Sequence, residues 1–328
     1  MLRRHWRSGA VLAASTLVAC GLFAPAPASA DSGIAHPQAV TNAQAEKVSA
    51  YWTPARMRAA IPMDQLLART TKKISGKVAA GRPATVRPTA VGGVVQPQAF
   101  PSGGGAWTGG GAVVHTAGRV FFVYNDAGTP RNASCSGNAV TSGNKSVVIT
   151  AGHCVKLGGN FHTKWTFVPA YNNGNAPYGT WSARATMSTP QWVASEDINY
   201  DVGAAVVNQL NGKSLTDVVG GQGVAFNQAK NAAMYAFGWP AADPYDGTKM
   251  IYCSGNTFNA LISDGIGMTC DMTGGASGGP WFRSFNESTG TGLLNSVNSY
   301  KINLVSIWMF GPYFGADAQN LYNKAQAA

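Results

Sequence analysis

The chain has 328 residues, of which 45% are apolar and only 12% are charged, and its formal net charge is +10. This length allows one or two domains, and the apolar fraction is sufficient for a full hydrophobic core. The basic excess lies near the N-terminus, because residues 31–103 contain nine Lys/Arg and three Asp/Glu, whereas residues 104–328 contain twelve and eleven. The larger part is therefore nearly neutral and has no long Lys/Arg run, so we expect no nucleic-acid partner.

Residues 1–30 are typical of a secretory signal peptide. A basic head with three Arg precedes an apolar run over residues 10–22, and the segment ends at Ala30 in a small-residue cleavage site. The apolar run is shorter than the ~20 residues that a helix needs to span a bilayer. As an alternative, residues 17–20 resemble a bacterial lipobox, in which Cys20 would carry a lipid. We therefore expect a secreted, extracellular protein, with stable membrane association only if Cys20 is lipidated.

Residues 31–103 are interpreted as a propeptide or N-terminal extension. Residues 43–67 have apolar side chains at helical spacing, interrupted by the helix breakers Pro54 and Pro62. Residues 77–105 are rich in Pro, Gly, Ala and Val without a clear period, which is typical of a linker that proteases can cut. We expect the compact domain to begin between about residues 100 and 118, and we assign residues 104–328 to it.

Short runs with β-strand character follow one another through this domain, separated by Gly-Asn, Asp-Gly and Pro-containing clusters. Such spacing is typical of an all-β sandwich or barrel. The runs are residues 119–124, 146–150, 166–169, 203–207, 233–238, 279–282 and 302–309. A helical period is found only near the C-terminus, where residues 316–326 predict one helix.

Four cysteines remain after the signal peptide, namely Cys135, Cys154, Cys253 and Cys270. In an exported protein, four cysteines indicate two disulfides, and the residues alone leave three pairings open. The sequence has no Cys-x-x-Cys pair, so a structural zinc site is not expected. We expect neither a metal nor a cofactor.

Three local clusters contain the residue types that nucleophilic catalysis needs. His153 follows an apolar run over residues 147–149, Asp201 opens an apolar strand over residues 202–207, and Ser277 lies among glycines. Each cluster has a plainer interpretation by itself: a structural histidine, an aspartate that caps a turn, or a flexible glycine turn. Together they fit a catalytic triad, because a serine hydroxyl needs a neighbouring base and the base needs an acceptor that orients it. We therefore predict Ser277 as nucleophile, His153 as general base and Asp201 as orienting residue.

The glycines around Ser277 also predict an oxyanion hole. They allow a tight turn in which the N–H groups of Gly275 and Ser277 converge on one point. The pattern Gly275-x-Ser277-x-Gly279 equally fits the nucleophile elbow of α/β-hydrolases, which place the histidine after the serine. No histidine follows Ser277 here, and the order His153, Asp201, Ser277 also differs from the subtilisin order.

The three clusters resemble the signature regions of trypsin/chymotrypsin-like serine peptidases. The matching segments are Thr150-Ala-Gly-His-Cys154, Asp201-Val-Gly-Ala204 and Gly275-Ala-Ser-Gly-Gly-Pro280. The stretch from Asp271 to Ser277 is most similar to the bacterial branch that includes the V8-like glutamyl endopeptidases, and residues 167–171 and 178–181 resemble secreted actinobacterial members. The resemblance covers about residues 115–315.

This resemblance implies an all-β fold of two antiparallel six-stranded β-barrels, with the triad in the cleft between them. It also implies a disulfide between Cys135 and Cys154 beside the base, which leaves Cys253 to pair with Cys270. Each disulfide would stabilise the fold by about 3 kcal/mol. Animal members carry an Asp before the nucleophile that pairs with the new N-terminal amine on activation; Ala276 occupies that position here, so this switch is absent.

The specificity of cleavage is open among three alternatives. Asp271, six residues before Ser277, lies where trypsin-like enzymes bind Lys or Arg, but glutamate-specific relatives carry a similar Asp. Those relatives place a His on a later strand, and the equivalent here is Trp308, whose indole N–H carries no charge. A pocket walled by Trp308, Phe310 and Gly311 would instead favour apolar side chains.

The expected protein is a monomeric, secreted serine endopeptidase that hydrolyses protein or peptide substrates through an acyl-enzyme. If residues 31–103 are a propeptide, the chain is a zymogen. Two alternatives remain: a catalytically inactive binding protein with a protease fold, and a secreted esterase.

Overall fold

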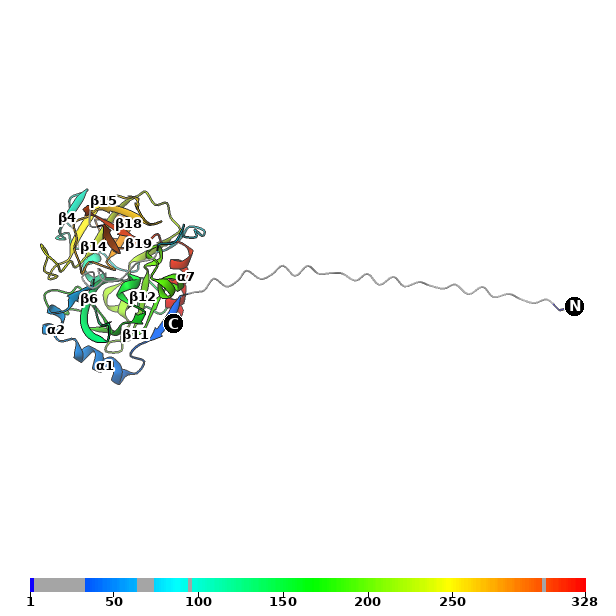
Figure 1. Cartoon of the computed structure of the whole chain (residues 1–328), viewed down its shortest axis with the longest axis horizontal. Helices are drawn as coiled ribbons and strands as arrows, with labels where there is room; N and C mark the ends of the chain where they lie inside the picture. Colours follow the sequence, from blue (N-terminus) through cyan, green and yellow to red (C-terminus); the bar gives the residue numbers. More distant parts are fainter. Residues whose placement is uncertain (3–32, 64–73, 94–95, 303–304) are drawn as a thin grey trace.

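The structure is a computed structural model that describes residues 1–2, 33–63, 74–93, 96–302 and 305–328 (Figure 1). The predicted signal peptide and the alternative lipobox with Cys20 lie outside the described residues, apart from the first two positions. In the described part of the chain, no helix is both long and apolar enough to cross a membrane.

The first half of the molecule contains a closed barrel of six antiparallel strands. The strands are β5 (Ala117–Asp126), β6 (Thr129–Ala139), β7 (Val147–Thr150), β10 (Thr163–Pro169), β11 (Trp181–Ser188) and β12 (Gly203–Val207). Their order is β11-β10-β5-β6-β7-β12, and β12 pairs back onto β11. The first eight residues of β5 are buried without alternation, because inward side chains fill the barrel while outward ones are covered by other elements.

The second half consists of two sheets. The larger sheet has the order β3-β13-β19-β18-β14-β15-β4 and the smaller one the order β16-β17-β21-β20. The larger sheet is built from β3 (Ala84–Val86), β4 (Ser102–Ala106), β13 (Gly223–Phe226), β14 (Ala233–Gly238), β15 (Ile251–Asn256), β18 (Pro280–Asn286) and β19 (Thr291–Val297). The smaller sheet is built from β16 (Phe258–Asn259), β17 (Ile266–Thr269), β20 (Tyr300–Ile302) and β21 (Val305–Gly311).

The prediction of an all-β fold with a six-stranded antiparallel barrel and a C-terminal helix is confirmed. The second half differs from the expected six-stranded barrel, because its strands form two separate sheets. A disulfide and a side-chain hydrogen bond are among the contacts that join them. Cys253 in β15 forms a disulfide with Cys270, which directly follows β17. At another junction Ser296 Oγ, in β19, donates a hydrogen bond of 2.8 Å to the carbonyl oxygen of Pro312.

The segment before residue 107 packs against both halves. In the first half, β1 (Ile34–Pro37) pairs with β11 and β2 (Ile61–Pro62) pairs with β6. The helical character expected over residues 43–67 is found in α1 (Asn42–Tyr51) and α2 (Pro54–Arg58), which Trp52 and Thr53 separate. The expectation is wrong at residues 61–62, which form β2, and residues 64–67 lie outside the described residues. Trp52 between them is 2% exposed, and its Nε1 donates to the carbonyl oxygen of Lys164. Because extended chain can pair at a sheet edge without any apolar period, the stretch expected to be a linker contributes β3 and β4.

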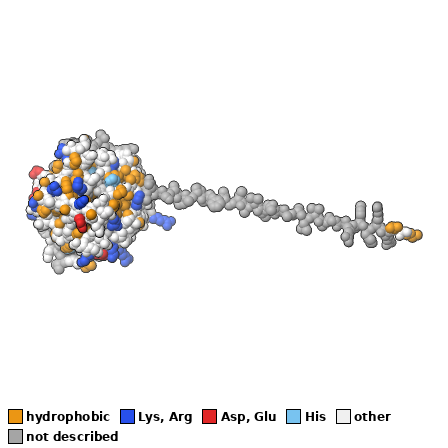
Figure 2. Space-filling model, turned by 90° about the horizontal axis from the view of Figure 1, so that it is seen from below, with side chains coloured by type: hydrophobic (Ala, Val, Ile, Leu, Met, Phe, Trp, Pro, Cys, Tyr) orange, Lys and Arg blue, Asp and Glu red, His pale blue; other side chains and the backbone are white. Residues whose placement is uncertain are grey.

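Short elements connect the strands, and α7 (Ala316–Ala327) closes the chain beside β12 (Figure 1). Tyr322 of α7 donates through its hydroxyl to the carbonyl oxygen of Thr141, 2.6 Å away. The face in Figure 2 presents Lys and Arg side chains scattered among uncharged ones. The remaining elements are α4 (Val113–Thr116), η1 (Gly152–Cys154), β8 (Lys156–Leu157), β9 (Asn160–Phe161), α5 (Pro190–Ser195), η2 (Ile198–Tyr200) and α6 (Leu215–Val219).

Candidate active site

Strand pairing in the barrel brings His153 and Asp201 together. In the antiparallel pair β7–β12, Thr150 at the end of β7 lies opposite Gly203 at the start of β12. His153 follows that end by three residues in the turn η1, and Asp201 precedes that start by two. The Nδ1 atom of His153 lies 2.7 Å from Oδ2 of Asp201, and the backbone N–H of His153 donates to Oδ1 at 2.8 Å. The two side chains are 1% and 2% exposed, so this is a buried pair.

Asp201 is held in its ionised form by several donors. Burial by itself would raise the pKa of this carboxyl group, but the imidazole of His153 and hydrogen bonds from His153 and Ser299 outweigh burial and lower the pKa below its usual value. The hydroxyl of Ser299, which follows β19 in the second half, donates to Oδ2 of Asp201 at 2.5 Å. Ser299 thus connects the two halves at the acidic member of the pair.

The loop that carries Ser277 is fixed through four consecutive carbonyl groups. The donors are Ala241 N to Gly274 O at 2.6 Å, Ser136 Oγ to Gly275 O at 2.9 Å, Asn298 Nδ2 to Ala276 O at 3.0 Å, and Ser136 N to Ser277 O at 2.7 Å. In a trans peptide the N–H points opposite to the preceding C=O. The N–H groups of Gly275 and Ser277 therefore point away from the donors that hold Gly274 and Ala276.

Two glycines of this loop have no possible substitute. Gly275 has φ +95°, and a Cβ there would lie 2.8 Å from the carbonyl oxygen of Trp239. Gly278 has φ +77°, and a Cβ there would collide with Oγ1 of Thr150 at the end of β7. Positive φ together with such a close approach requires glycine at these two positions, which explains part of the glycine run that the sequence places around Ser277.

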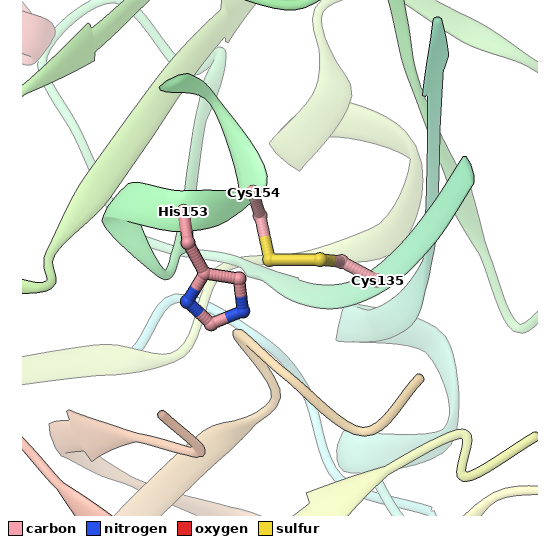
Figure 3. A group of neighbouring side chains, drawn as sticks. All are labelled: Cys135, His153 and Cys154. Carbon is pink, nitrogen blue, oxygen red and sulfur yellow. A yellow bond between two sulfur atoms is a disulfide. The ribbon is translucent and has the colours of Figure 1, made fainter. Parts of the chain in front are cut away.

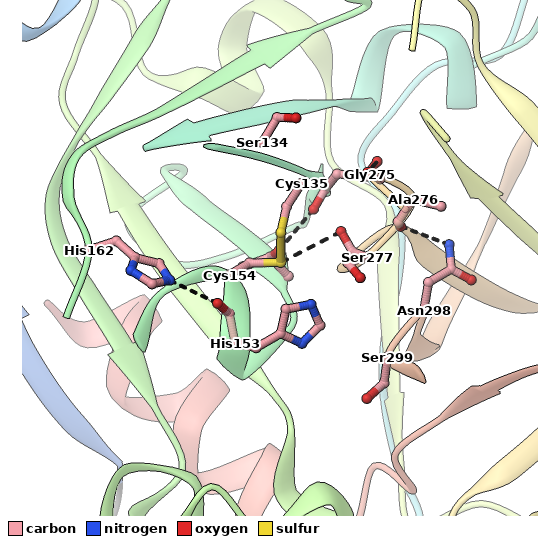
Figure 4. The surroundings of a disulfide bond; sticks show 12 residues. Ser134, Cys135, His153, Cys154, His162, Gly275, Ala276, Ser277, Asn298 and Ser299 are labelled. Carbon is pink, nitrogen blue, oxygen red and sulfur yellow. Dashed lines mark hydrogen bonds between the residues drawn. A yellow bond between two sulfur atoms is a disulfide. The ribbon is translucent and has the colours of Figure 1, made fainter. Parts of the chain in front are cut away.

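The predicted triad residues lie at the junction of the two halves. The disulfide between Cys135 and Cys154 ties β6 to the turn that carries His153 (Figure 3). On the other side, Sγ of Cys154 lies 3.7 Å from the carbonyl oxygen of Ser277, and Figure 4 shows His153 and Ser277 next to this disulfide. Ser277 is 2% exposed. The Nε2 atom of His153, on the ring edge away from Asp201, is buried and has no hydrogen-bond partner among the described residues.

The four residues predicted for the substrate pocket lie in or beside the sheet of β17 and β21. The side chain of Asp271 is exposed, and its Oδ1 accepts a hydrogen bond of 2.7 Å from the hydroxyl of Tyr245. Trp308 is half-buried opposite Thr269. Phe310 is fully buried, and Gly311 packs tightly against Ser296 and Val297. Asp271 and Trp308 are thus more accessible to a substrate than Phe310 and Gly311.

Three side chains that hold this site were not singled out from the sequence. Ser136 and Asn298 anchor the loop of Ser277, and Ser299 binds Asp201. Asn298 and Ser299 directly follow β19, with no glycine run or strand-to-histidine pattern that would mark them. Their partners are also distant in the chain: Ser136 binds a residue 139 positions away, and Ser299 binds one 98 positions away.

The same neighbourhood contains the grouping of possible metal ligands Cys135, His153 and Cys154, found within the described part of the chain. Metal-binding cysteines need their thiolates, and both sulfur atoms here are consumed by a disulfide. The imidazole of His153 is engaged with Asp201 through Nδ1. These residues therefore do not fit a metal ion.

No family model matches the chain. A curated relative, the "Extracellular metalloprotease" of Bacillus subtilis (strain 168), is 29% identical over 181 residues, which are 53% of this chain and 55% of that protein. The chain thus spans about half the length of this relative.

Solved structures give broader coverage. The protease Anisep from Arthrobacter nicotinovorans is 45% identical, with a TM-score of 0.62, over 66% of this chain and 98% of that one. The thermostable serine protease AL20 from an extremophilic microorganism is 37% identical, with a TM-score of 0.62, over 66% and 99%. A Glu endopeptidase is 15% identical over 70% of this chain and 99% of that one, with a TM-score of 0.54, and shares the fold.

Proposed function

Because this chain belongs to the chymotrypsin-like serine proteases, we propose that it is an endopeptidase whose catalytic triad is His153, Asp201 and Ser277. The observation that carries this proposal is the buried hydrogen bond of 2.7 Å between Nδ1 of His153 and Asp201, beside the anchored loop of Ser277. Relatives in this family act on proteins or peptides, so the substrate class is the same.

In the proposed mechanism, Oγ of Ser277 attacks the carbonyl carbon of the scissile peptide while Nε2 of His153 takes its proton. Asp201 keeps the Nδ1–H tautomer and stabilises the imidazolium that forms. The N–H groups of Gly275 and Ser277 receive the developing oxyanion. His153 then returns the proton to the leaving amine as the C–N bond breaks, which leaves an acyl-enzyme on Ser277. Water repeats the sequence and releases the acid.

The support for these roles comes from the described contacts. Ionised Asp201 can accept Nδ1–H only if Nε2 is the basic nitrogen, and Nε2 is the ring nitrogen left without a partner among the described residues. Catalytic hydrogen bonds are often loose without substrate and tighten in the complex. The name of the Bacillus subtilis relative implies a metal for that protein. The proposed mechanism uses none, because the cysteines beside His153 form a disulfide and do not fit a metal ion.

The test is covalent labelling of the secreted protein with a fluorophosphonate, followed by mass spectrometry. Wild type is expected to be labelled at Ser277, and Ser277→Ala to lose the label and at least about 10³-fold in kcat with the fold retained. Ser288→Ala, at an exposed serine in the same half, is the matched control and should keep both the label at Ser277 and the wild-type kcat. A folded wild type without label would overturn the proposal, including its distinction from an inactive binding protein. Comparing matched peptide and ester substrates separates an endopeptidase from an esterase.

For specificity, we infer a pocket with Asp271 and Trp308 in reach of the substrate and Phe310 and Gly311 in its packed wall. The exposure of Asp271 and the half-burial of Trp308 support this arrangement. Digestion of a peptide library, with the cut sites read by mass spectrometry, distinguishes basic, acidic and apolar preference. A preference for basic residues that survives Asp271→Asn would contradict a charge-pairing role of Asp271.

We further propose that residues 1–30 direct secretion and that residues 31–103 are a propeptide of a monomeric zymogen. The two disulfides support an oxidising, extracellular location. The packing of β1, α1 and Trp52 on the barrel supports a propeptide that folds together with the protease. N-terminal sequencing of the secreted form, with mass spectrometry at Cys20, reads the processing site and any lipid; an uncut N-terminus in the active enzyme would contradict the zymogen.

A further inference from the structure

The segment that begins at His153 is held through four consecutive carbonyl groups. The carbonyl oxygen of His153 accepts from Nε2 of His162 at 2.8 Å, as Figure 4 shows. The next three acceptors are the carbonyl oxygens of Cys154, with Trp165 Nε1 at 2.9 Å; Val155, with His162 N at 2.9 Å; and Lys156, with Trp192 Nε1 at 2.8 Å. Buried ring N–H groups therefore supply three of the four donors.

The ring of His162 is fixed in one place. It is fully buried and stacks on Phe122, with 4.3 Å between the ring centroids and 5° between the ring planes. Tyr124 packs edge-on at 5.5 Å. The backbone carbonyl oxygen of His162 accepts a hydrogen bond of 2.8 Å from Nε2 of Gln38, which directly follows β1. An imidazole held on its face, its edge and its backbone has little freedom to reorient.

The hydrogen bond to His153 defines the chemical form of His162. A carbonyl oxygen only accepts, so Nε2 of His162 must carry a proton, and in the neutral ring Nδ1 then carries none. Nδ1 is buried without a partner among the described residues. Burial lowers the pKa of His162 to about 3. His162 is therefore a neutral donor in one tautomer at every pH at which a serine protease works.

Packing alone does not explain a histidine at this position. A phenylalanine would fill the same flat space beside Phe122 without burying a polar atom that lacks a partner, which is costly. The polar contact that the imidazole ring gains, within the described residues, is the one to the carbonyl oxygen of His153. A histidine rather than an apolar ring at this position is therefore explained by its hydrogen bond to His153.

This contact completes the support of the base. The peptide plane before the Cα of His153 is held by its N–H, which donates to Asp201. The peptide plane after that Cα is held by its C=O, which accepts from His162. Because peptide groups are planar, fixing both planes fixes the direction of the Cα–Cβ bond between them. The side chain of His153 is then aimed by its own backbone as well as by Asp201.

We propose that His162 is a positioning residue for the reaction, and that its Nε2–H donated to the carbonyl oxygen of His153 aims the base at Ser277. This inference rests on the proposed role of His153 as general base. His162 itself touches neither substrate nor Ser277 in the mechanism. Since misplacement of a reacting group by about 1 Å can cost about 10²-fold in rate, loss of this bond should appear in kcat.

The test compares three variants of the full chain, processed as the wild type is. His162→Phe keeps a flat ring and loses the donor, whereas His162→Gln keeps a donor amide at the place of Nε2. Trp165→Phe is the matched control, because it removes the ring N–H from the carbonyl oxygen of the next residue, Cys154. For each we measure kcat, KM, the rate of acylation by a fluorophosphonate, and Tm.

We expect His162→Phe to lower kcat and the acylation rate by about 10- to 100-fold with KM changed by less than about 3-fold. In His162→Gln, kcat should recover to within about 3-fold of wild type. In Trp165→Phe, kcat should stay in that range although Tm falls about as much as in His162→Phe. If His162→Phe loses no more kcat than Trp165→Phe, or if His162→Gln is as slow as His162→Phe, the inference is wrong.

A second measurement covers the case in which His162→Phe does not fold. Nitrogen-15 NMR of histidine-labelled wild type should find His162 protonated at Nε2 and bare at Nδ1; the opposite tautomer would overturn the inference. An inactive, unlabelled wild type would instead overturn the proposed function, and this inference with it. An active wild type that fails either of the other tests overturns the role of His162 alone.

Discussion

The turn that carries His153 is held within a single barrel, whereas the loop that carries Ser277 is held by both halves of the molecule. On the first side, the disulfide from β6 binds Cys154 and the ring N–H of His162 binds the carbonyl oxygen of His153, and both come from the same half. On the second side, Asn298 of the same half binds Ala276, while Ser136 of the barrel binds the carbonyl oxygens on either side of it. The proposed base is therefore positioned within one half, and the loop of the proposed nucleophile depends on the docking of the two halves.

This difference has a physical cause. His153 follows β7 of the closed barrel, and the groups that bind it directly, Asp201 and His162, belong to the same half. The Ser277 loop precedes β18 in a half whose two sheets are joined partly by a disulfide and side-chain contacts. A substitution on the base side should therefore act on chemistry, whereas one on the nucleophile side should act on chemistry and on the docking of the halves together.

The largest expected effect lies on the base side. Asp201→Asn should lower kcat by about 10⁴-fold, because an amide in place of the carboxylate favours the wrong imidazole tautomer. Asp197→Asn, in the same segment and at the cap of η2, is the matched control and should keep kcat within about 3-fold. Steady-state kinetics with active-site titration measures both. A variant Asp201→Asn with more than about a tenth of wild-type kcat contradicts the triad.

The two disulfides allow a direct comparison of the sides. They close loops of similar length, with sequence separations of 19 and 17, so replacing either pair by serine should lower the free energy of unfolding by about 3 kcal/mol. The loss of kcat should be larger for Cys135/Cys154, because Cys154 is bonded to His153. Urea unfolding and kinetics below the unfolding temperature measure the two quantities. Equal losses of kcat would remove the distinction drawn between the sides.

Ser136→Ala tests the dependence of the nucleophile loop on docking. It removes a hydroxyl that accepts from the N–H of Trp239 and donates to the carbonyl oxygen of Gly275. We expect a loss of about 1–2 kcal/mol in the free energy of unfolding and about 10-fold in kcat. Ser182→Ala, a buried serine of the same barrel, should lower stability with kcat unchanged. Loss of stability without loss of kcat in Ser136→Ala would show that the loop keeps its shape independently.

Ser299→Ala should have the smallest effect and lower the free energy of unfolding by about 1 kcal/mol at neutral pH. The Ser299 hydroxyl helps to lower the pKa of Asp201 below its usual value of about 3.9. Such a carboxylate adds stability above that value and loses it as the pH falls through its folded-state pKa. The variant raises that pKa, so its deficit should be full at neutral pH and shrink below about pH 4. Urea unfolding across pH checks this; a deficit that grows in acid would reverse the sign.

Much of the fold follows from local patterns. Apolar runs bounded by glycine turns indicated short strands, and the period over residues 316–326 indicated α7. The split of the second half into two sheets could not be foreseen, because a strand pattern does not record which strands pair or which contacts, such as Cys253–Cys270 and the Ser296 hydrogen bond, join two sheets. The pairing of β3 and β4 was equally hidden, since edge pairing uses backbone groups that every residue has.

For the site, the residues alone predicted His153, Asp201 and Ser277, because a strand that runs into a histidine and a serine among glycines are local features; the structure brings His153 and Asp201 into contact. Gly275 and Gly278 need positive φ, and that requirement is written in the residue type itself. Ser136, Asn298 and Ser299 became visible only when distant segments met, and His162 only when the chain turned back onto His153, nine residues earlier. A hydroxyl, an amide or an imidazole gains its role from what lies within about 3 Å of it, and that neighbour is set by packing between strands far apart in the chain.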